Sequence, residues 1–323
     1  DAKHALRREV ARLRALKALH EAPAASRVAS LLKQQRENEQ LRQAIREQRF
    51  LLTRAQSALS GWAITQRPPF ERYIHLGSNW ADRMETFAAL KQRLLPDAER
   101  YLNERVHGLG PTQEYSHATN FTAPNGDSCF LGFDVILLEG FSSVRQVFDA
   151  MRTFYFNMEI TWTETSSELM LREGDYETGD QDVATQRFVR STSSGVQIES
   201  STILCSIFRN GGTGSSGSEE GDSAVFAVDF VDQDELYPYH QHEHLRQDIT
   251  SVLTLTVCPT KKPALANGAK DKEASNDSVI MLRRYFYGRL RLSELELPPD
   301  VAHEVECGSN FWFKTMLRTV GEM

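Results

Sequence analysis

Apolar residues recur at helical spacing through the first sixty positions of the chain. Between residues 3 and 21, Leu6, Val10 and Leu13 begin a series of apolar positions at steps of three and four, which predicts an amphipathic helix. Pro23 follows. Because proline lacks the backbone N–H that a helix interior needs, we expect this helix to end there.

A second helix, with Ser26 as its predicted N-cap, carries a heptad pattern. Its a positions are apolar with one asparagine among them: Leu31, Asn38, Ile45, Leu52 and Leu59. Leu41 is the one large apolar residue at the d positions, so the seam predicts weak association. Two arrangements fit this pattern, a self-dimer and an antiparallel hairpin with the first helix. We expect the coiled-coil arm to span residues 1–66.

The pattern changes after the arm. Helices are expected over residues 80–106, capped by Ser78 and continuing past Pro96, and over residues 142–156 behind a serine cap. Segments rich in Val, Ile, Thr and aromatic residues predict strands at 129–138, 159–164, 195–208, 224–231, 249–257 and 279–292. Because the later strands follow one another without helices, the sheet should be antiparallel and the fold class α+β.

A short apolar helix is expected at the C-terminal end of the sequence. Trp312, Met316 and Val320 stand four residues apart, so the helix should bury one face against the sheet. We expect Gly308 to interrupt it. Residues 67–323 therefore form the second predicted domain, with flexible loops at 210–222 and 260–277, two segments poor in apolar residues.

The composition is that of a soluble globular protein. Of 323 residues, 40% are hydrophobic, and no apolar run approaches the ~20 residues needed to cross a bilayer. The four cysteines, Cys129, Cys205, Cys258 and Cys307, form no C-x-x-C pair, which argues against a zinc knuckle and a dense disulfide framework. A cytoplasmic protein is the plainest interpretation, with the nucleus as the alternative.

Charge is divided unequally along the chain. Residues 1–60 hold 13 Lys/Arg against 6 Asp/Glu, whereas the remaining residues hold 24 against 38. A basic helix on an acidic body can be attracted to nucleic acid or to an anionic membrane. The alternative is that the arginines are the solvated face of a long helix.

Candidate chemistry is sparse. Residues 212–217 match G-x-G-x-x-G, but acidic residues follow where a phosphate-binding helix should begin. His240, His242 and His244 would share one face of an extended segment and could hold zinc, with or without Glu243. We expect an exposed polar loop there instead. Because no catalytic motif is present, we expect a protein that is not an enzyme and has no cofactor and no metal.

Three stretches carry a resemblance to a known family: residues 31–59 with the heptad segment RENEQLR at 36–42, residues 129–151 and residues 279–292. Together with the order of predicted elements, they resemble the START-like helix-grip fold. The chain is similar to oomycete START-like or mating-specific proteins, which carry a bZIP-like coiled coil before the START-like domain.

The resemblance implies an antiparallel sheet around the terminal helix, with a cavity for a lipid or other hydrophobic ligand. Trp312, Met316, Phe313 and Phe286 would line that cavity; the alternative is that they fill a solid core. The terminal helix departs from the family pattern, because it is shorter and Gly308 is expected to break it, so the cavity is either open or collapsed.

The rival prediction is a regulatory or interaction protein, in one version related to transcription, whose body binds partners rather than lipid. The arm would then bind a second copy or another helix. DNA binding needs a continuous basic helix ahead of the zipper. Residues 1–22 hold six Lys/Arg but are followed by Pro23, so nucleic acid is the weaker expectation for a partner.

Overall fold

The computed structural model describes residues 2–63, 71–106, 109, 113–166, 168–173, 182–213, 219–258, 279–295 and 301–322. All of the predicted loop 260–277, and residues 214–218 of the predicted loop 210–222, lie outside these residues. The chain divides into two compact units, Asp1–Arg54 and Ala55–Met323, and each is described by itself. Within the described residues, no helix is long and apolar enough to span a membrane.

The N-terminal element is a single helix, α1, Ala2–Ala63. The predicted end at Pro23 and the second start at Ser26 are therefore wrong, and so is a hairpin of two helices within the chain. Proline costs a helix interior about 3 kcal/mol. Alanine and leucine residues on both sides have the highest helix propensities and favour continuation.

Among the described residues, eight strands form the main sheet, in the order β2-β3-β12-β11-β9-β6-β5-β4. Their bounds are β2 Tyr115–Thr122, β3 Ser128–Leu138, β12 Val279–Leu290, β11 His244–Cys258, β9 Ser223–Phe230, β6 Gln197–Arg209, β5 Val183–Ser191 and β4 Met170–Glu173. Neighbours in this order are antiparallel. The start of β11 also pairs in parallel with the start of β6.

Two pairs of short strands complete the described sheet structure. β1, His75–Leu76, pairs in parallel with β10, Gln233–Asp234. β7, Gly212–Thr213, pairs with β8, Glu219–Glu220, within the region predicted as a loop.

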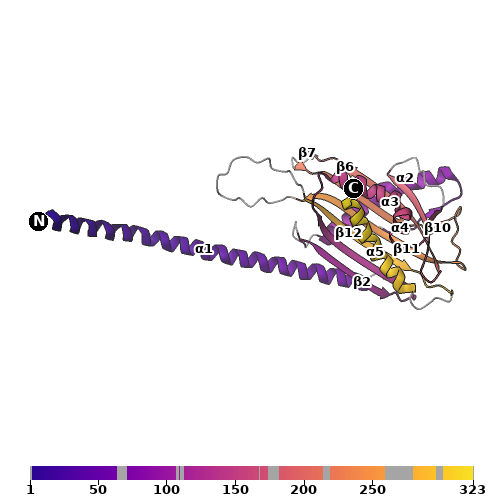
Figure 1. The fold of residues 1–323 in the computed structure, drawn as a ribbon, viewed down its shortest axis with the longest axis horizontal. Coiled ribbons are helices and arrows are strands. Elements are labelled where there is room, and N and C mark those ends of the chain that lie inside the picture. Colours follow the sequence, from indigo (N-terminus) through magenta and orange to yellow (C-terminus); the bar gives the residue numbers. More distant parts are fainter. Residues whose placement is uncertain are drawn as a thin grey trace. The chain divides into compact units, whose positions relative to one another are not determined.

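Helices pack on both faces of the main sheet (Figure 1). On one face lies α2, Trp80–Val106; on the other lie α3, Val144–Phe156, α4, Met158–Ser166, and α5, Val301–Glu322. Strand alternation assigns neighbouring residues to different faces: Tyr285 contacts Tyr101 of α2, whereas Phe286 faces the cavity described below. The predicted α+β class, with a large antiparallel sheet and a C-terminal helix, is confirmed.

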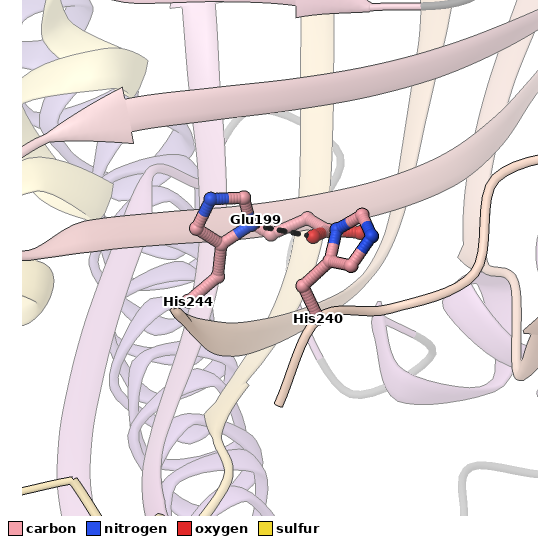
Figure 2. Close-up of side chains that lie close together, drawn as sticks. All are labelled: Glu199, His240 and His244. Carbon is pink, nitrogen blue, oxygen red and sulfur yellow. Dashed lines mark hydrogen bonds and ion pairs between the residues drawn. The ribbon is translucent and has the colours of Figure 1, made fainter. Parts of the chain in front are cut away.

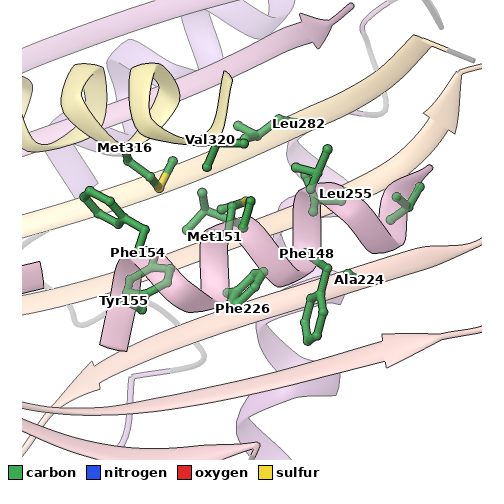
Figure 3. Close-up of a cluster of buried hydrophobic side chains, with 14 of the residues drawn as sticks. Phe148, Met151, Phe154, Tyr155, Ala224, Phe226, Leu255, Leu282, Met316 and Val320 are labelled. Carbon is green, nitrogen blue, oxygen red and sulfur yellow. The ribbon is translucent and has the colours of Figure 1, made fainter. Parts of the chain in front are cut away.

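The core between α3, α5 and the sheet is apolar and closely packed (Figure 3). α3 contributes Phe148, Met151 and Phe154, and α5 contributes Met316 and Val320. The predicted serine cap of α3 is present, since Ser143 Oγ accepts a hydrogen bond from the backbone N–H of Gln146. The cap and the apolar face together fix where α3 begins and which side it buries.

Three local predictions are wrong. Residues 159–164 are helical, in α4, rather than a strand. Their threonines and isoleucine favour strands, but in the helix Thr165 Oγ1 and Ser166 Oγ donate to carbonyls of the preceding turn. The cap of α2 is Asn79 rather than Ser78, because Asn79 Oδ1 accepts from the N–H of Ala81.

The third wrong prediction is the break at Gly308, which lies inside the continuous helix α5. A Cβ atom at this position would lie 3.2 Å from Cη2 of Trp162 and 3.5 Å from Nη2 of Arg190. The glycine therefore permits a close approach between α5, α4 and β5. Its helix-breaking tendency, about 1 kcal/mol, is offset by that packing.

Candidate functional site

A cavity of about 80 Å³ lies between α5, α4, the end of α3 and the inner face of the sheet. Residues from β4, β5, β6, β9, β11 and β12 form its floor. This volume is roughly half that of an engineered apolar cavity of ~150 Å³ that holds benzene. The described conformation therefore admits a small apolar group.

The wall of the cavity is mainly apolar and aromatic. Its large side chains include Met158, Trp162, Met170, Phe188, Phe286 and Trp312. Trp312 is held by three neighbours: its ring centroid lies 5.6 Å from those of Phe154 and Tyr155, and its Nε1 donates to Sδ of Met158 at 2.7 Å. A fixed aromatic wall of this kind is typical of sites for hydrophobic small molecules.

The polar part of the wall comes from the strands. Arg190 Nη1 lies 3.2 Å from Glu168 Oε2, and its guanidinium lies 5.4 Å from the ring centroid of Trp162. Burial lowers the pKa of Arg190, while Glu168 raises it. Gln186 Nε2 donates to the carbonyl of Tyr155 at 3.0 Å and so ties the end of α3 to β5.

Two donors on the wall have no hydrogen-bond partner among the described residues: Tyr155 Oη and Trp162 Nε1. Both side chains are buried, at 2% and 6% exposed. Burial raises the pKa of Tyr155 well above its usual value, so the hydroxyl keeps its proton. A buried donor without a partner costs about 1–3 kcal/mol, and a bound acceptor would recover that energy.

The four residues expected to line the cavity divide into two pairs. Trp312 and Phe286 lie on the wall. Met316 belongs to the core cluster around α3, and Phe313 lies with its ring centroid 3.5 Å from the guanidinium carbon of Arg284. Helical spacing explains why Phe313 faces another way than its neighbour Trp312. Met316 lies one turn farther along α5 and packs into the core cluster instead.

The arm residues expected to form a coiled coil lie on α1. Leu31, Leu41 and Ile45 are 64%, 61% and 48% exposed, and Asn38 is exposed. The side chains of Leu52 and Leu59 lie outside the described residues. The seam is therefore accessible to a second helix within the part of α1 whose side chains are described.

Sequence reasoning missed the β5 residues of the cavity wall. Arg190, Gln186 and Phe188 alternate along β5, a strand that was not expected. The β-branched and aromatic residues Val183, Thr185, Phe188 and Val189 are the signal that could have identified this strand. Tyr155 and Trp162 gave no comparable signal, because nothing local marks an aromatic donor as unpaired.

The chain matches no protein-family model and no curated protein. Among solved structures, that of Ara h 8.0201 matches 60% of this chain and 99% of its own, with 10% sequence identity and a TM-score of 0.25. A likeness of this size supports no inference about what this chain binds.

Proposed function

We propose that this protein binds a hydrophobic small molecule in the cavity beneath α5, without catalysing a reaction. The observation that carries the proposal is the combination of an aromatic wall with two unpartnered donors, Tyr155 Oη and Trp162 Nε1. Such a wall favours apolar surface by about 25 cal/mol per Å² buried. The donors favour a ligand that carries a hydrogen-bond acceptor, such as a carbonyl, carboxylate or hydroxyl oxygen.

The size of the cavity limits the ligand. Most ligand pockets occupy roughly 300–1,000 Å³, whereas this cavity has about 80 Å³. A lipid, as the START-like resemblance implies, requires displacement of α4 or α5. Both helices contribute residues on one side of the cavity, and the sheet strands form the other, so such a movement would enlarge the cavity without breaking strand pairing.

The same wall supports binding rather than catalysis. Arg190 and Tyr155 are its ionisable residues among those described. Arg190 is paired with Glu168, and Tyr155 has a pKa raised by burial. Neither is suited to transfer a proton near neutral pH.

Two phenylalanine substitutions test the proposal. Tyr155→Phe removes a buried donor without a partner, so it should leave the free energy of unfolding unchanged or raise it by about 1 kcal/mol. The same variant should weaken ligand binding by about tenfold, because the loss of one hydrogen bond worth about 1.4 kcal/mol raises the dissociation constant tenfold. Ligand affinity should thus fall without any loss of stability.

The control is Tyr287→Phe. Tyr287 Oη lies 3.3 Å from Cys129 Sγ, and this tyrosine is not on the cavity wall. This variant loses a hydrogen bond and should be slightly less stable, with unchanged ligand binding. The ligand would be identified by solvent extraction and mass spectrometry of the purified protein, and its affinity measured by calorimetry. A protein that releases no hydrophobic molecule and binds no fatty acid or sterol would refute the proposal.

A second candidate function rests on α1. Leu6, Leu13 and Leu16 are 70%, 58% and 52% exposed, like the apolar residues farther along the same helix. A helix of 62 residues is roughly 90 Å long. We propose that this helix forms a coiled coil with a second helix and gives the protein a regulatory or interaction role.

Sedimentation of the full chain tests this second proposal. The double variant Leu41→Glu, Ile45→Glu should convert a dimer to a monomer, whereas Gln40→Glu, at an exposed position off the a and d seam, should not. A monomeric wild type would refute self-association. A salt-dependent shift of duplex DNA by the wild type would support the bZIP-like version.

A further inference from the structure

The turn before β11 brings two histidines together. The backbone N–H groups of Glu243 and His244 both donate to the carbonyl of His240 at 3.0 Å, which closes a turn of helical type. The rings of His240 and His244 therefore lie with centroids 5.9 Å apart. His242, which an extended segment would have placed beside them, hydrogen-bonds Gln241 instead.

A buried glutamate from another strand completes the group. Glu199 lies on β6, and its Oε2 is 2.9 Å from Nδ1 of His244. Register explains the meeting, because Arg246 of β11 pairs with Glu199 in the parallel contact between the two strands. One ligand atom from each of Glu199, His240 and His244 lies within 4.8 Å of the others (Figure 2).

We propose that Glu199, His240 and His244 form a binding site for a divalent transition-metal ion, and zinc fits this set of donors best. Imidazole nitrogens and a carboxylate oxygen are common zinc ligands, at about 2.0–2.2 Å. A tetrahedral ion would hold the three ligand atoms about 3.4 Å apart. Small side-chain rotations would bring the ligand atoms, which now lie within 4.8 Å of one another, to that separation. His240 is exposed and can make most of this adjustment.

The surroundings hold two of the ligands in place. Glu199 Oε1 accepts from Arg187 Nε at 3.1 Å, and Glu173 balances the charge of Arg187 at 2.7 Å. Tyr239 Oη donates to the carbonyl of His244 at 2.6 Å and fixes the backbone of the turn. Partners of this kind orient ligands and strengthen metal binding by about 10–100-fold.

Three protein ligands leave one tetrahedral position open. A cleft of about 410 Å³ adjoins the site, since Glu199 and Tyr239 line it together with Asp232 and Glu235. The acidic lining favours entry of a cation. The open position would take water or an anionic group from this cleft, as in zinc sites that exchange ligands.

The site is independent of the proposed function. Ile198 and Ser200 line the cavity beneath α5, and Glu199 lies between them on β6 with its side chain on the opposite face of the sheet. Loss of metal should therefore leave hydrophobic ligand binding unchanged, and the two proposals can fail separately.

Calorimetric titration of the untagged full chain with Zn²⁺, after treatment with a chelator, tests the proposal. The wild type should bind one ion. His240→Ala and His244→Ala should each weaken binding by at least about tenfold, because loss of a residue that only orients a metal ligand already costs about 10–100-fold. Substituting Co²⁺ should give the visible absorption of a tetrahedral ion in the wild type and lose it in both variants.

The matched control is His242→Ala, in the same turn but outside the group, which should bind zinc like the wild type. His240 is exposed, so its substitution should not impair folding, and urea unfolding of each variant checks this. Absence of saturable zinc binding by the wild type would overturn the proposal. Equal weakening in all three histidine variants, or in none, would do so as well.

Discussion

Replacing Asp134 by asparagine should destabilise the body of the protein far more than the same change at an exposed ion pair. Asp134 Oδ2 accepts from Arg284 Nε at 2.9 Å, and the two side chains are 9% and 3% exposed. Arg284 also lies against Phe313 of α5. Asparagine keeps the shape of Asp134 but leaves a buried guanidinium without a counter-charge.

The expected loss follows from the burial of the pair. At an effective dielectric constant of about 20, unit charges about 4 Å apart attract each other by about 4 kcal/mol. Breaking a buried pair by removing one partner typically costs about 3–5 kcal/mol. Burial lowers the pKa of Arg284, and Asp134 opposes that shift. The variant should therefore keep a buried positive charge that no carboxylate compensates.

Urea unfolding followed by tryptophan fluorescence measures the effect. The control is Asp149→Asn, which breaks the pair of Arg145 and Asp149, whose side chains are 55% and 52% exposed, and should cost at most about 0.5 kcal/mol. The double variant Asp134→Asn, Arg284→Met should recover much of the loss, since a buried pair replaced by apolar groups is often neutral. Equal losses of less than about 1 kcal/mol in both single variants would refute the reasoning.

Two further predictions concern α5 and the outer face of the sheet. Gly308→Ala should lower the free energy of unfolding by up to about 2 kcal/mol, because overpacking against Trp162 outweighs the gain in helix propensity. Gly321→Ala, with nothing within 4 Å of its new Cβ, should be neutral or stabilising. Thermal unfolding of both variants measures this, and a larger loss of stability in Gly321→Ala than in Gly308→Ala would contradict the packing argument. Burial, reinforced by Glu71, raises the pKa of Asp229 to about 8, compared with about 3.9 in an unfolded chain. The native state then binds the extra proton between about pH 4 and pH 8, so stability should fall as pH rises through that window, by at most about 1.4 kcal/mol per pH unit. Urea unfolding across this range should show that slope in the wild type and lack it in Asp229→Asn, and parallel curves would argue against a neutral buried Asp229.

Sequence predicted the elements whose signal is local. The helical face and serine cap of α3 and the long apolar strands β3, β9, β11 and β12 follow directly from periodicity. Gly308 shows where such reasoning stops. Its place inside α5 depends on Trp162 and Arg190 from other elements, and local propensity contains no information about them.

The candidate sites divide in the same way. Trp312 was identifiable, because aromatic residues on an apolar helical face tend to be buried. The group of Glu199, His240 and His244 was not, since it depends on the turn at 240–244 and on the parallel contact of β6 with β11. An extended segment would have placed His242 on the same face as His240 and His244. The turn instead directs His242 away from the group.

The position of β12 has a consequence for the folding of the chain during synthesis. β12 lies between β3 and β11 in the sheet, yet in chain order it follows the other seven strands of that sheet. Until β12 leaves the ribosome, β3 and β11 each lack one of their two neighbouring strands, and α3 lacks α5, which packs on it. Such long-range pairings slow folding and expose strand edges meanwhile. We therefore expect the sheet to form in one cooperative step only once β12 has been synthesised, and a chain that stops before β12 to aggregate rather than fold into a smaller domain.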